Sequence, residues 1–164
     1  MDTTEKFMKI SEAYINKDCE TEKIKESKNI VTLLTPKAFL SYLENPCSLR
    51  QGLEKMRHYG FTAMPVVAKD GTYMGTVSEG DFLWHMLDNN LYTLKEQEKI
   101  SISTIIRKGW NPPVKINATM DDILLRIMEQ NFVPVIDDRE KFMGIITRKS
   151  VIQYYYVLLK RENT

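Results

Sequence analysis

Two short polar motifs hold the residues most able to do chemistry in this sequence. Ser78 is followed three positions later by Asp81, and Thr147 is followed directly by Arg148 and Lys149. Each hydroxyl stands where an apolar run ends, so we expect it at the start of a helix, where backbone N–H groups favour an anion. Arginine can grip a phosphate with two parallel hydrogen bonds, and a carboxylate can accept from both ribose hydroxyls. The motifs indicate a site for a phosphorylated ligand; the plainer alternative is helix capping and solvated charge.

The sequence motifs of familiar enzymes are missing. We find no P-loop, no nucleophile elbow and no His-Glu-x-x-His. The two cysteines, Cys19 and Cys47, lack the spacing of metal ligands. They are interpreted as unrelated reduced thiols, with a disulfide between them as the alternative. The sequence therefore predicts neither an enzyme nor a metal site.

The composition is that of a globular protein and does not point to nucleic acid or a membrane surface as a partner. The chain has 164 residues, of which 43% are hydrophobic and 27% charged, and its formal net charge is +1. This near-zero net charge does not suggest nucleic acid as a partner. No apolar run approaches the roughly 20 residues of a membrane helix, and residues 1–10 carry charges where a signal peptide would be apolar. We expect a cytoplasmic protein with neither nucleic acid nor membrane as partner.

The chain contains an internal repeat. Residues 64–67 (MPVV) and 73–78 (YMGTVS) recur 69 positions later as 133–136 (VPVI) and 142–147 (FMGIIT). Upstream, Ser48-Leu49 matches Thr119-Met120 at a separation of 71, so the second copy lacks two residues before its strand. Serine and threonine are good helix N-caps, and apolar residues follow each at helical spacing. Each copy reads as strand, helix, strand, strand, helix, and neither could bury its apolar face alone.

The repeat divides the chain into five segments. The expected order is a charged and partly helical leader with an apolar stripe of Phe7, Ile10 and Tyr14 (1–28), a first repeat (29–87), a polar connector (88–99), a second repeat (100–160) and a short tail (161–164). Within the second repeat, Tyr154, Tyr155 and Tyr156 fall on successive faces of the last helix. At least one of these tyrosines is expected to be exposed, which is compatible with an oligomer contact.

The repeated pattern resembles the CBS domain pair, also called the Bateman module. The resemblance rests on residues 62–66 (TAMPV) followed by 75–81 (GTVSEGD), and on 132–135 (FVPV) followed by 144–150 (GIITRKS). It covers roughly residues 30–156. The chain is similar in particular to small stand-alone bacterial CBS-pair proteins, some of which are AMP or cyclic di-AMP receptors.

The resemblance implies both a fold and a function. The fold would be α/β, with two tandem CBS repeats packed sheet to sheet about a pseudo-twofold axis. The protein would form a homodimer and act as a non-enzymatic regulatory sensor of an adenine nucleotide (AMP, ADP, ATP or cyclic di-AMP) that reports to an unidentified protein partner. No catalytic cofactor is implied. The alternative is a constitutive protein–protein adaptor whose nucleotide pockets are degenerate.

The resemblance also implies two pockets. In the family, the strands of one repeat contact the base, while the Ser/Thr-x-x-Asp motif of the other contacts ribose and phosphate. The first pocket would combine residues of both repeats, namely Ser41, Leu43, Thr62 and Ala63 with Thr147, Arg148 and Lys149. The second would combine Pro112, Val114, Asn131 and Phe132 with Ser78 and Asp81.

The two expected pockets are not equivalent. Ser150 stands where the first pocket would carry its ribose carboxylate, and Phe132 occupies the position in the second that matches the small Ala63. The Phe132 ring could stack on a base or fill the space that the base would occupy. The first pocket is therefore predicted to be the occupied one. Ser150 and Phe132 are also the two residues that favour the adaptor alternative.

Overall fold

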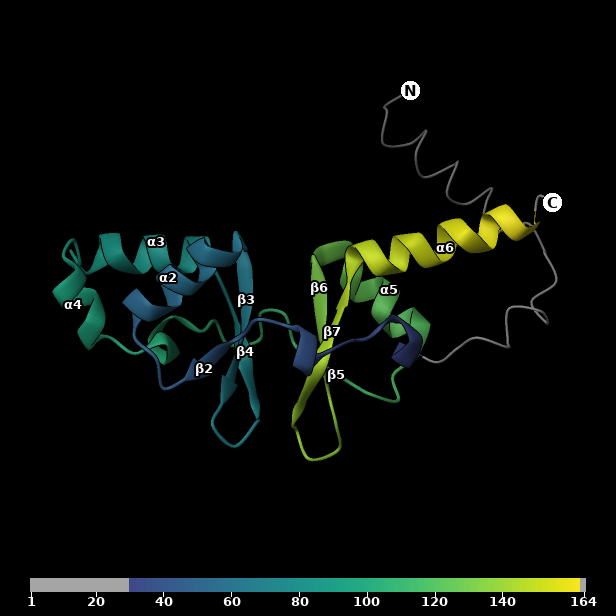
Figure 1. Ribbon diagram of the computed structural model, residues 1–164, viewed down its shortest axis with the longest axis horizontal. Coiled ribbons are helices and arrows are strands. Elements are labelled where there is room, and N and C mark those ends of the chain that lie inside the picture. Colours follow the sequence, from purple (N-terminus) through teal and green to yellow (C-terminus); the bar gives the residue numbers. More distant parts are fainter. Residues whose placement is uncertain (1–29, 163–164) are drawn as a thin grey trace, which may run out of the picture.

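Two α/β halves lie side by side with their sheets facing each other and their helices outside (Figure 1). The computed structural model describes residues 30–162. The elements follow in the order η2 (Ile30–Leu33), β1 (Thr35–Pro36), η3 (Lys37–Phe39), β2 (Leu43–Asn45), α2 (Leu49–Tyr59), β3 (Ala63–Ala68), β4 (Tyr73–Ser78), α3 (Glu79–Asp88), α4 (Leu94–Lys99), η4 (Ile102–Ile105), β5 (Val114–Lys115), α5 (Met120–Glu129), β6 (Phe132–Ile136), β7 (Phe142–Thr147) and α6 (Arg148–Glu162).

The two sheets repeat one another strand for strand. One sheet has the order β2-β3-β4 and the other β1-β7-β6-β5. In both, the repeat's first strand runs parallel to the second, and the second and third form an antiparallel hairpin with a register shift at the matching place. Ala63 pairs with Ser78 in the first hairpin, as Phe132 pairs with Thr147 in the second. The predicted α/β fold of two tandem repeats is confirmed.

The helices begin where the sequence places their caps. The Ser48 hydroxyl accepts from the Gln51 N–H at the start of α2, and the Thr119 hydroxyl accepts from Asp122 at the start of α5. Helix α2 ends at Gly60, whose left-handed conformation (φ 66°) lets its N–H bond back into the last turn. Helix α5 has no such glycine, because the second repeat lacks two residues at this junction.

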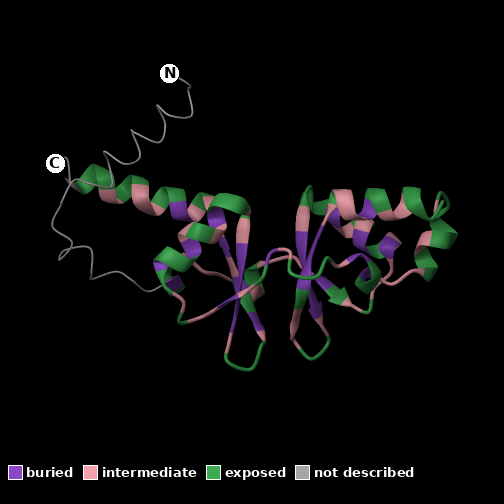
Figure 2. Cartoon of the chain, turned by 180° about the vertical axis from the view of Figure 1, so that it is seen from behind, coloured by how far each residue is buried: buried purple, intermediate pink, exposed green. Residues whose placement is uncertain are grey.

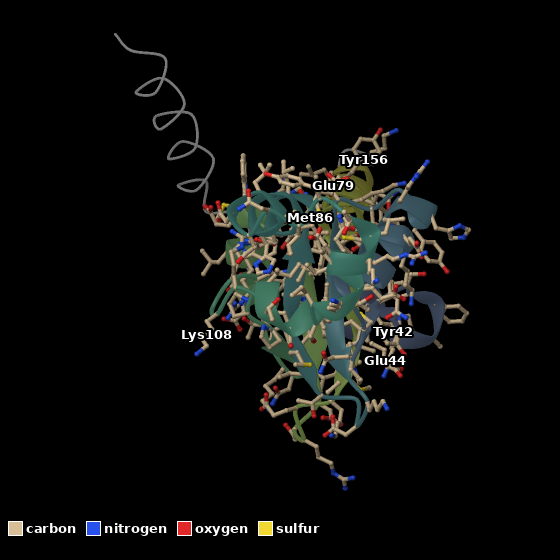
Figure 3. The ribbon with its side chains drawn as sticks, turned by 90° about the vertical axis from the view of Figure 1, so that its left-hand side faces the viewer. Tyr42, Glu44, Glu79, Met86, Lys108 and Tyr156 are labelled. Atoms are coloured by element: carbon tan, nitrogen blue, oxygen red, sulfur yellow. The ribbon has the colours of Figure 1, made fainter. Side chains whose placement is uncertain are left out.

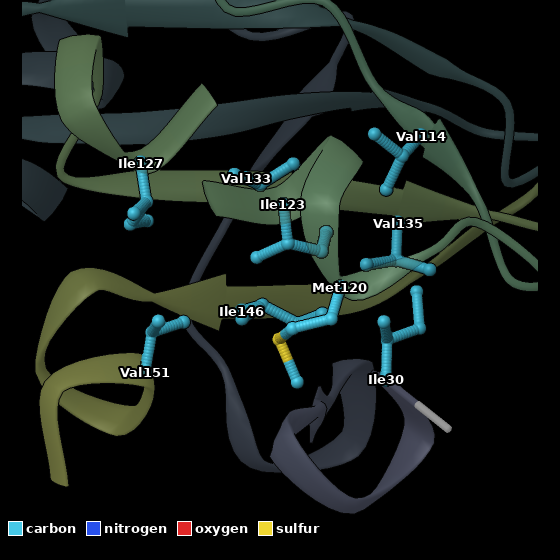
Figure 4. Packing of buried hydrophobic residues seen from close by; sticks show 9 residues of the cluster. All are labelled: Ile30, Val114, Met120, Ile123, Ile127, Val133, Val135, Ile146 and Val151. Carbon is cyan, nitrogen blue, oxygen red and sulfur yellow. The ribbon is translucent and has the colours of Figure 1, made fainter. Parts of the chain in front are cut away.

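Each half completes its core with a segment from outside its own repeat. Ile30 packs in the second repeat's cluster with Val114, Met120, Ile123, Ile127, Val133, Val135, Ile146 and Val151 (Figure 4). Ile102 and Ile105 pack in the first repeat's cluster. Buried residues gather on the strands and on the inward side of the helices (Figure 2). The cores thus exchange the segments that precede β2 and β5, which sequence order alone assigns to the following repeat.

Two glycines make this exchange sterically possible. A Cβ at Gly144 would lie 2.1 Å from the carbonyl oxygen of Thr35, because β1 pairs directly with β7. A Cβ at Gly75 would lie 2.4 Å from the side chain of Ile106. Any larger residue would push the exchanged segment away from the sheet.

The connector between the repeats is more ordered than its polar composition suggests. It contains α4, whose first turn is capped by Thr93 and Glu96, and hydrogen bonds between Thr93 and Glu96 lower the pKa of that carboxyl. The last helix also runs to Glu162, beyond residue 160, where the second repeat was expected to end. The leader, with its predicted stripe of Phe7, Ile10 and Tyr14, lies outside the described residues. No helix between residues 30 and 162 is long and apolar enough to cross a membrane.

The two hairpin tips are joined across the repeats. Lys141 Nζ lies 2.8 Å from Asp70 Oδ2 and donates to Thr72 Oγ1 at 2.9 Å. The Phe142 N–H donates to the Gly71 carbonyl at 2.9 Å. Hydrogen bonds from Lys141 and Thr72 lower the pKa of Asp70 to about 2. These contacts hold the halves together at the end of the sheets remote from the helix starts.

Candidate functional site

A cavity of about 270 Å³ opens between the two halves. Its walls come from the segment before β2, the starts of β3 and β6, and the end of β7. The residues that line it are Leu40, Ser41, Gly60, Phe61, Thr62, Ala63, Pro65, Asn131, Phe132, Ile145 and Thr147. Most of this surface is apolar, with a few polar groups around it, which is the usual character of a small-molecule site.

The repeat register explains why these residues meet. In each hairpin the start of one strand pairs with the end of the next, so Ala63 lies opposite Ser78, and Phe132 opposite Thr147. The first N–H of α6, on Arg148, donates to the Asn131 carbonyl at 2.8 Å, and the equivalent N–H of Glu79 donates to Thr62 at 3.0 Å. Both helix starts are therefore held beside the strands that line the cavity.

Four of the residues expected in the first pocket line this cavity, namely Ser41, Thr62, Ala63 and Thr147. Leu43 does not, because its side chain is buried in the first repeat's core, and Val114 is buried in the second core in the same way. Sequence reasoning treated residues 41–43 as one strand edge, whereas β2 begins only at Leu43.

Phe132 and Asn131 line the same cavity as Ala63. Sequence reasoning assigned them to a separate second pocket, whereas the cavity brings them beside residues of the first pocket. The reason is the pseudo-twofold relation, which brings the matching positions 63 and 132 to one shared space. The small and the large residue at these positions both line a single cavity.

The Thr147 hydroxyl is oriented by the residue three positions on. Its oxygen accepts from the Ser150 N–H at 3.0 Å, and the Ser150 hydroxyl donates to the Thr147 carbonyl at 2.8 Å. Within residues 30–162 no acceptor takes the Thr147 hydroxyl proton. Lys149 is exposed, and its ammonium group forms no hydrogen bond or ion pair with a described residue. The start of α6 thus offers a hydroxyl donor at the cavity and, two residues further on, an exposed cation.

Arg148 closes the end of α5. Its Nε donates to the Ile127 carbonyl at 2.9 Å, and its Nη2 donates to Gln130 at 3.0 Å and to Met128 at 3.4 Å. These carbonyls belong to the helix end that lacks a glycine cap. Nη1 makes no hydrogen bond within the described part of the chain, so the guanidinium keeps one nitrogen for another partner.

Ser78 and Asp81 form a closed cluster away from the cavity lining. Asp81 Oδ2 accepts from both the N–H and the hydroxyl of Ser78, each at 2.7 Å. Asp81 Oδ1 lies 2.8 Å from Arg107 Nε, and the carboxylate side chain is only 9% exposed. The Arg107 guanidinium in turn lies 3.8 Å over the ring of Trp110. Sequence reasoning missed Arg107, because a single arginine in a connecting segment carries no recognisable pattern.

The place that matches the cavity by pseudo-symmetry is filled by protein. Asn111 precedes β5 as Leu40 precedes β2, and it is 3% exposed. Its side-chain N–H donates to Thr76 Oγ1 at 3.2 Å, and the Tyr73 hydroxyl donates to its carbonyl at 3.0 Å. Burial raises the pKa of Tyr73 to about 12. The described structure therefore has one open site and one closed site between its repeats.

Metal-binding groups do not gather in the described part of the chain. Among residues 30–162 there is no cluster of three or more His, Cys, Asp or Glu side chains that could hold a metal ion. The Cys47 thiol is free and partly buried, and burial raises its pKa. Cys19 lies outside the described residues.

The chain belongs to the CBS domain family. The family model for the CBS domain matches residues 46–88 and 102–157, one match in each repeat, so the protein is a CBS domain pair as the resemblance predicted. Comparison with curated proteins found no match.

Several solved structures are similar over most of the chain. CbpB in complex with c-di-AMP is 26% identical, with 82% of this chain and 89% of that one covered and a TM-score of 0.76. CbpB from Streptococcus agalactiae is 27% identical, with 78% and 80% covered and a TM-score of 0.71. A CBS domain protein from Streptococcus pneumoniae TIGR4 is 25% identical, with 79% and 87% covered and a TM-score of 0.72.

Proposed function

We propose that this protein is a cytoplasmic, non-enzymatic regulatory module that binds an adenine nucleotide, with cyclic di-AMP as the first candidate, and reports it to a protein partner. The observation that carries the proposal is the cavity between the repeats, whose rim holds the Thr147 hydroxyl at the start of α6. The similar CbpB structure in complex with c-di-AMP supports the choice of ligand.

The cavity suits one adenine base with its ribose. Leu40, Ala63 and Pro65 supply apolar walls, and Phe132 supplies an aromatic one on which a base can stack. Ser41 and the backbone beside it can form hydrogen bonds with the edge of the base. A volume of about 270 Å³ lies at the lower limit of ligand pockets, roughly 300 Å³. We therefore expect one nucleoside of a cyclic dinucleotide inside and its phosphates at the rim.

The rim suits a phosphate. The Thr147 hydroxyl can donate outward, Lys149 brings an exposed cation, and Arg148 keeps Nη1 for a further bond. The N–H groups of the first turn of α6 add positive potential at the same place. Because Arg148 is already held by three carbonyls, it would meet the phosphate without losing much conformational freedom.

A thermal-shift panel of cyclic di-AMP, AMP, ADP and ATP tests the proposal. A ligand at 100 times its Kd stabilises the folded state by about 2.7 kcal/mol. For a chain of this size that raises the melting temperature by roughly 5–10 °C. Calorimetry of the active compound should then give one site per chain, since the matching place is filled by Asn111. If none of the four nucleotides shifts the melting temperature, nucleotide sensing is refuted.

We also propose a homodimer formed through α3 and α6. These helices run along the same side of the molecule (Figure 1), and Met86 and Tyr156 lie at that edge (Figure 3). Trp84 is 62% exposed and Tyr156 is 58% exposed. Tyr156 is thus the exposed member of the three tyrosines. A light-scattering mass of one chain at micromolar concentration would refute the dimer.

The second candidate is a constitutive protein–protein adaptor. The closed second site favours it, because Asp81 is already paired with Arg107 and Asn111 fills the slot. An adaptor would bind its partner equally with and without nucleotide. The nucleotide panel separates the two functions directly.

A further inference from the structure

A groove of about 530 Å³ runs along α6, beside the segment that leads from η2 into β1. The apolar side chains that line it are Leu33, Leu34, Tyr154, Val157 and Leu158. The groove shares no lining residue with the cavity between the halves, and Tyr156, proposed above for the dimer contact, does not line it. It is therefore a surface distinct from both the proposed nucleotide site and that contact.

The apolar surface of the groove is only partly covered. Leu33, Leu34 and Tyr154 pack against the second repeat's core without being fully buried. Val157 is 47% exposed. An apolar helix face of this kind ordinarily packs against another element. One more helix laid along α6 would therefore extend the second repeat's core outward.

The leader, residues 1–28, is the segment of this chain that can reach the groove. The described chain begins at Ile30, which is 1% exposed in the second repeat's core, and η2 packs on α6. Fifteen residues separate Tyr14 from Ile30, and a chain of that length can span up to about 50 Å. The groove side of α6, from Ser150 to Arg161, is twelve residues or roughly 18 Å long. The tether is thus long enough to let the leader lie along the whole groove.

The leader also matches the groove in pattern and length. Phe7, Ile10 and Tyr14 recur at helical spacing, and Asp18 follows Tyr14 by one turn on the same face. A helix from 7 to 18 would be twelve residues, again roughly 18 Å. Arg161 is the last residue of α6 that lines the groove, so it can pair with an acid at the end of the stripe. A helix this short is marginal in water unless its apolar face is packed.

We infer that the leader folds back over this groove as a short helix that runs in the same direction as α6. Phe7, Ile10 and Tyr14 lie on the apolar surface, and Asp18 lies beside Arg161. The leader of the same chain is favoured over a second copy, because its tether joins the fold beside the groove and holds it at a high effective concentration.

A cross-link within one chain tests the docking. The full-length chain with Cys19→Ser and Cys47→Ser has no natural thiol left. In it, Ile10→Cys with Val157→Cys places one thiol on the stripe and one in the groove, and oxidised glutathione should join them. Glu12→Cys with Val157→Cys is the matched control, because position 12 lies on the opposite side of the same helix. A disulfide needs Cα atoms within about 7 Å, so the stripe pair should close about tenfold faster or more.

Charge reversal tests the direction of the leader. Asp18→Lys and Arg161→Glu, each added to the stripe pair, should slow the cross-link about threefold, as expected for one exposed ion pair. The double reversal should restore the rate, which a merely structural effect of either substitution would not do. If the double variant stays as slow as the single ones, the pairing of Asp18 with Arg161 is wrong.

The product of the cross-link distinguishes the possible occupants. A disulfide within the monomer that forms only with the stripe pair supports the inference. A disulfide-linked dimer would show that the groove receives a second copy, and equal rates for the stripe and control pairs would show that the leader does not dock; either result overturns it. The melting temperature of each reduced variant, expected within a few degrees of the wild type, checks the fold. Because nucleotide binding plays no part in this test, failure of the proposed function would leave the inference standing.

Discussion

Replacing Arg148 with alanine should destabilise the ligand-free protein. Helix α5 ends without the left-handed glycine that closes α2, and its last carbonyls are satisfied by the Arg148 guanidinium instead. Alanine would leave these carbonyls to water at a half-buried helix end. Arg148 is therefore expected to matter for folding even when no nucleotide is present.

The distances set the size of the effect. Two of the three bonds are short, 2.9 Å to Ile127 and 3.0 Å to Gln130, and the third, to Met128, is 3.4 Å. Hydrogen bonds to charged groups contribute roughly 1.5–3 kcal/mol each. Because water can replace part of these bonds at a partly exposed site, we expect a total loss of about 2 kcal/mol. The melting temperature should then fall by roughly 4–8 °C.

Thermal denaturation of the ligand-free protein measures this loss. Arg148→Lys keeps the charge but cannot reach all three carbonyls, so its melting temperature should be intermediate. Lys149→Ala is the matched control, since the ammonium group of this exposed neighbour bonds to no described residue; a surface substitution of this kind changes stability by at most about 0.5 kcal/mol. A melting temperature of Arg148→Ala within about 1 °C of the wild type would refute the capping role. Weaker nucleotide binding by the same variant would then assign Arg148 to the phosphate alone.

Two further predictions concern the hairpin tips and the slot. Asp70→Asn should lower the melting temperature at pH 7, because the pKa of Asp70 is held at about 2 by Lys141 and Thr72. A pKa that is lower in the folded state stabilises the fold at pH values above the unfolded pKa of 3.8. The difference in melting temperature from the wild type should therefore shrink steadily as pH falls from about 4 through 2. A difference at pH 2 as large as that at pH 7 would contradict this. Ala63→Phe should abolish nucleotide binding, because the larger side chain fills the cavity. The melting temperature of the ligand-free variant should stay within a few degrees of the wild type. An affinity unchanged in calorimetry would show that the base binds at another place.

Much of the fold could be predicted from local pattern. Patterns of residues close together in the chain predicted the N-caps Ser48 and Thr119 and the two hairpins, and their recurrence 69 positions later predicted the repeat. Capping and strand pairing across a tight turn depend on groups only a few positions apart, so spacing alone is informative. The missing glycine in the second repeat was visible in the sequence too, although its consequence for Arg148 was not.

The contacts that define the site depend on residues far apart in the chain. Phe132 shares one cavity with Ala63 because of the pseudo-twofold packing of the halves, and no periodicity encodes that meeting. Arg107 reaches Asp81 only because the segment before β5 packs on the first repeat. Sequence by itself determined the repeats, their helix starts and the family. The tertiary structure alone decided that one inter-repeat site is open and the other closed, since this depends on which side chains the exchanged segments carry into each space.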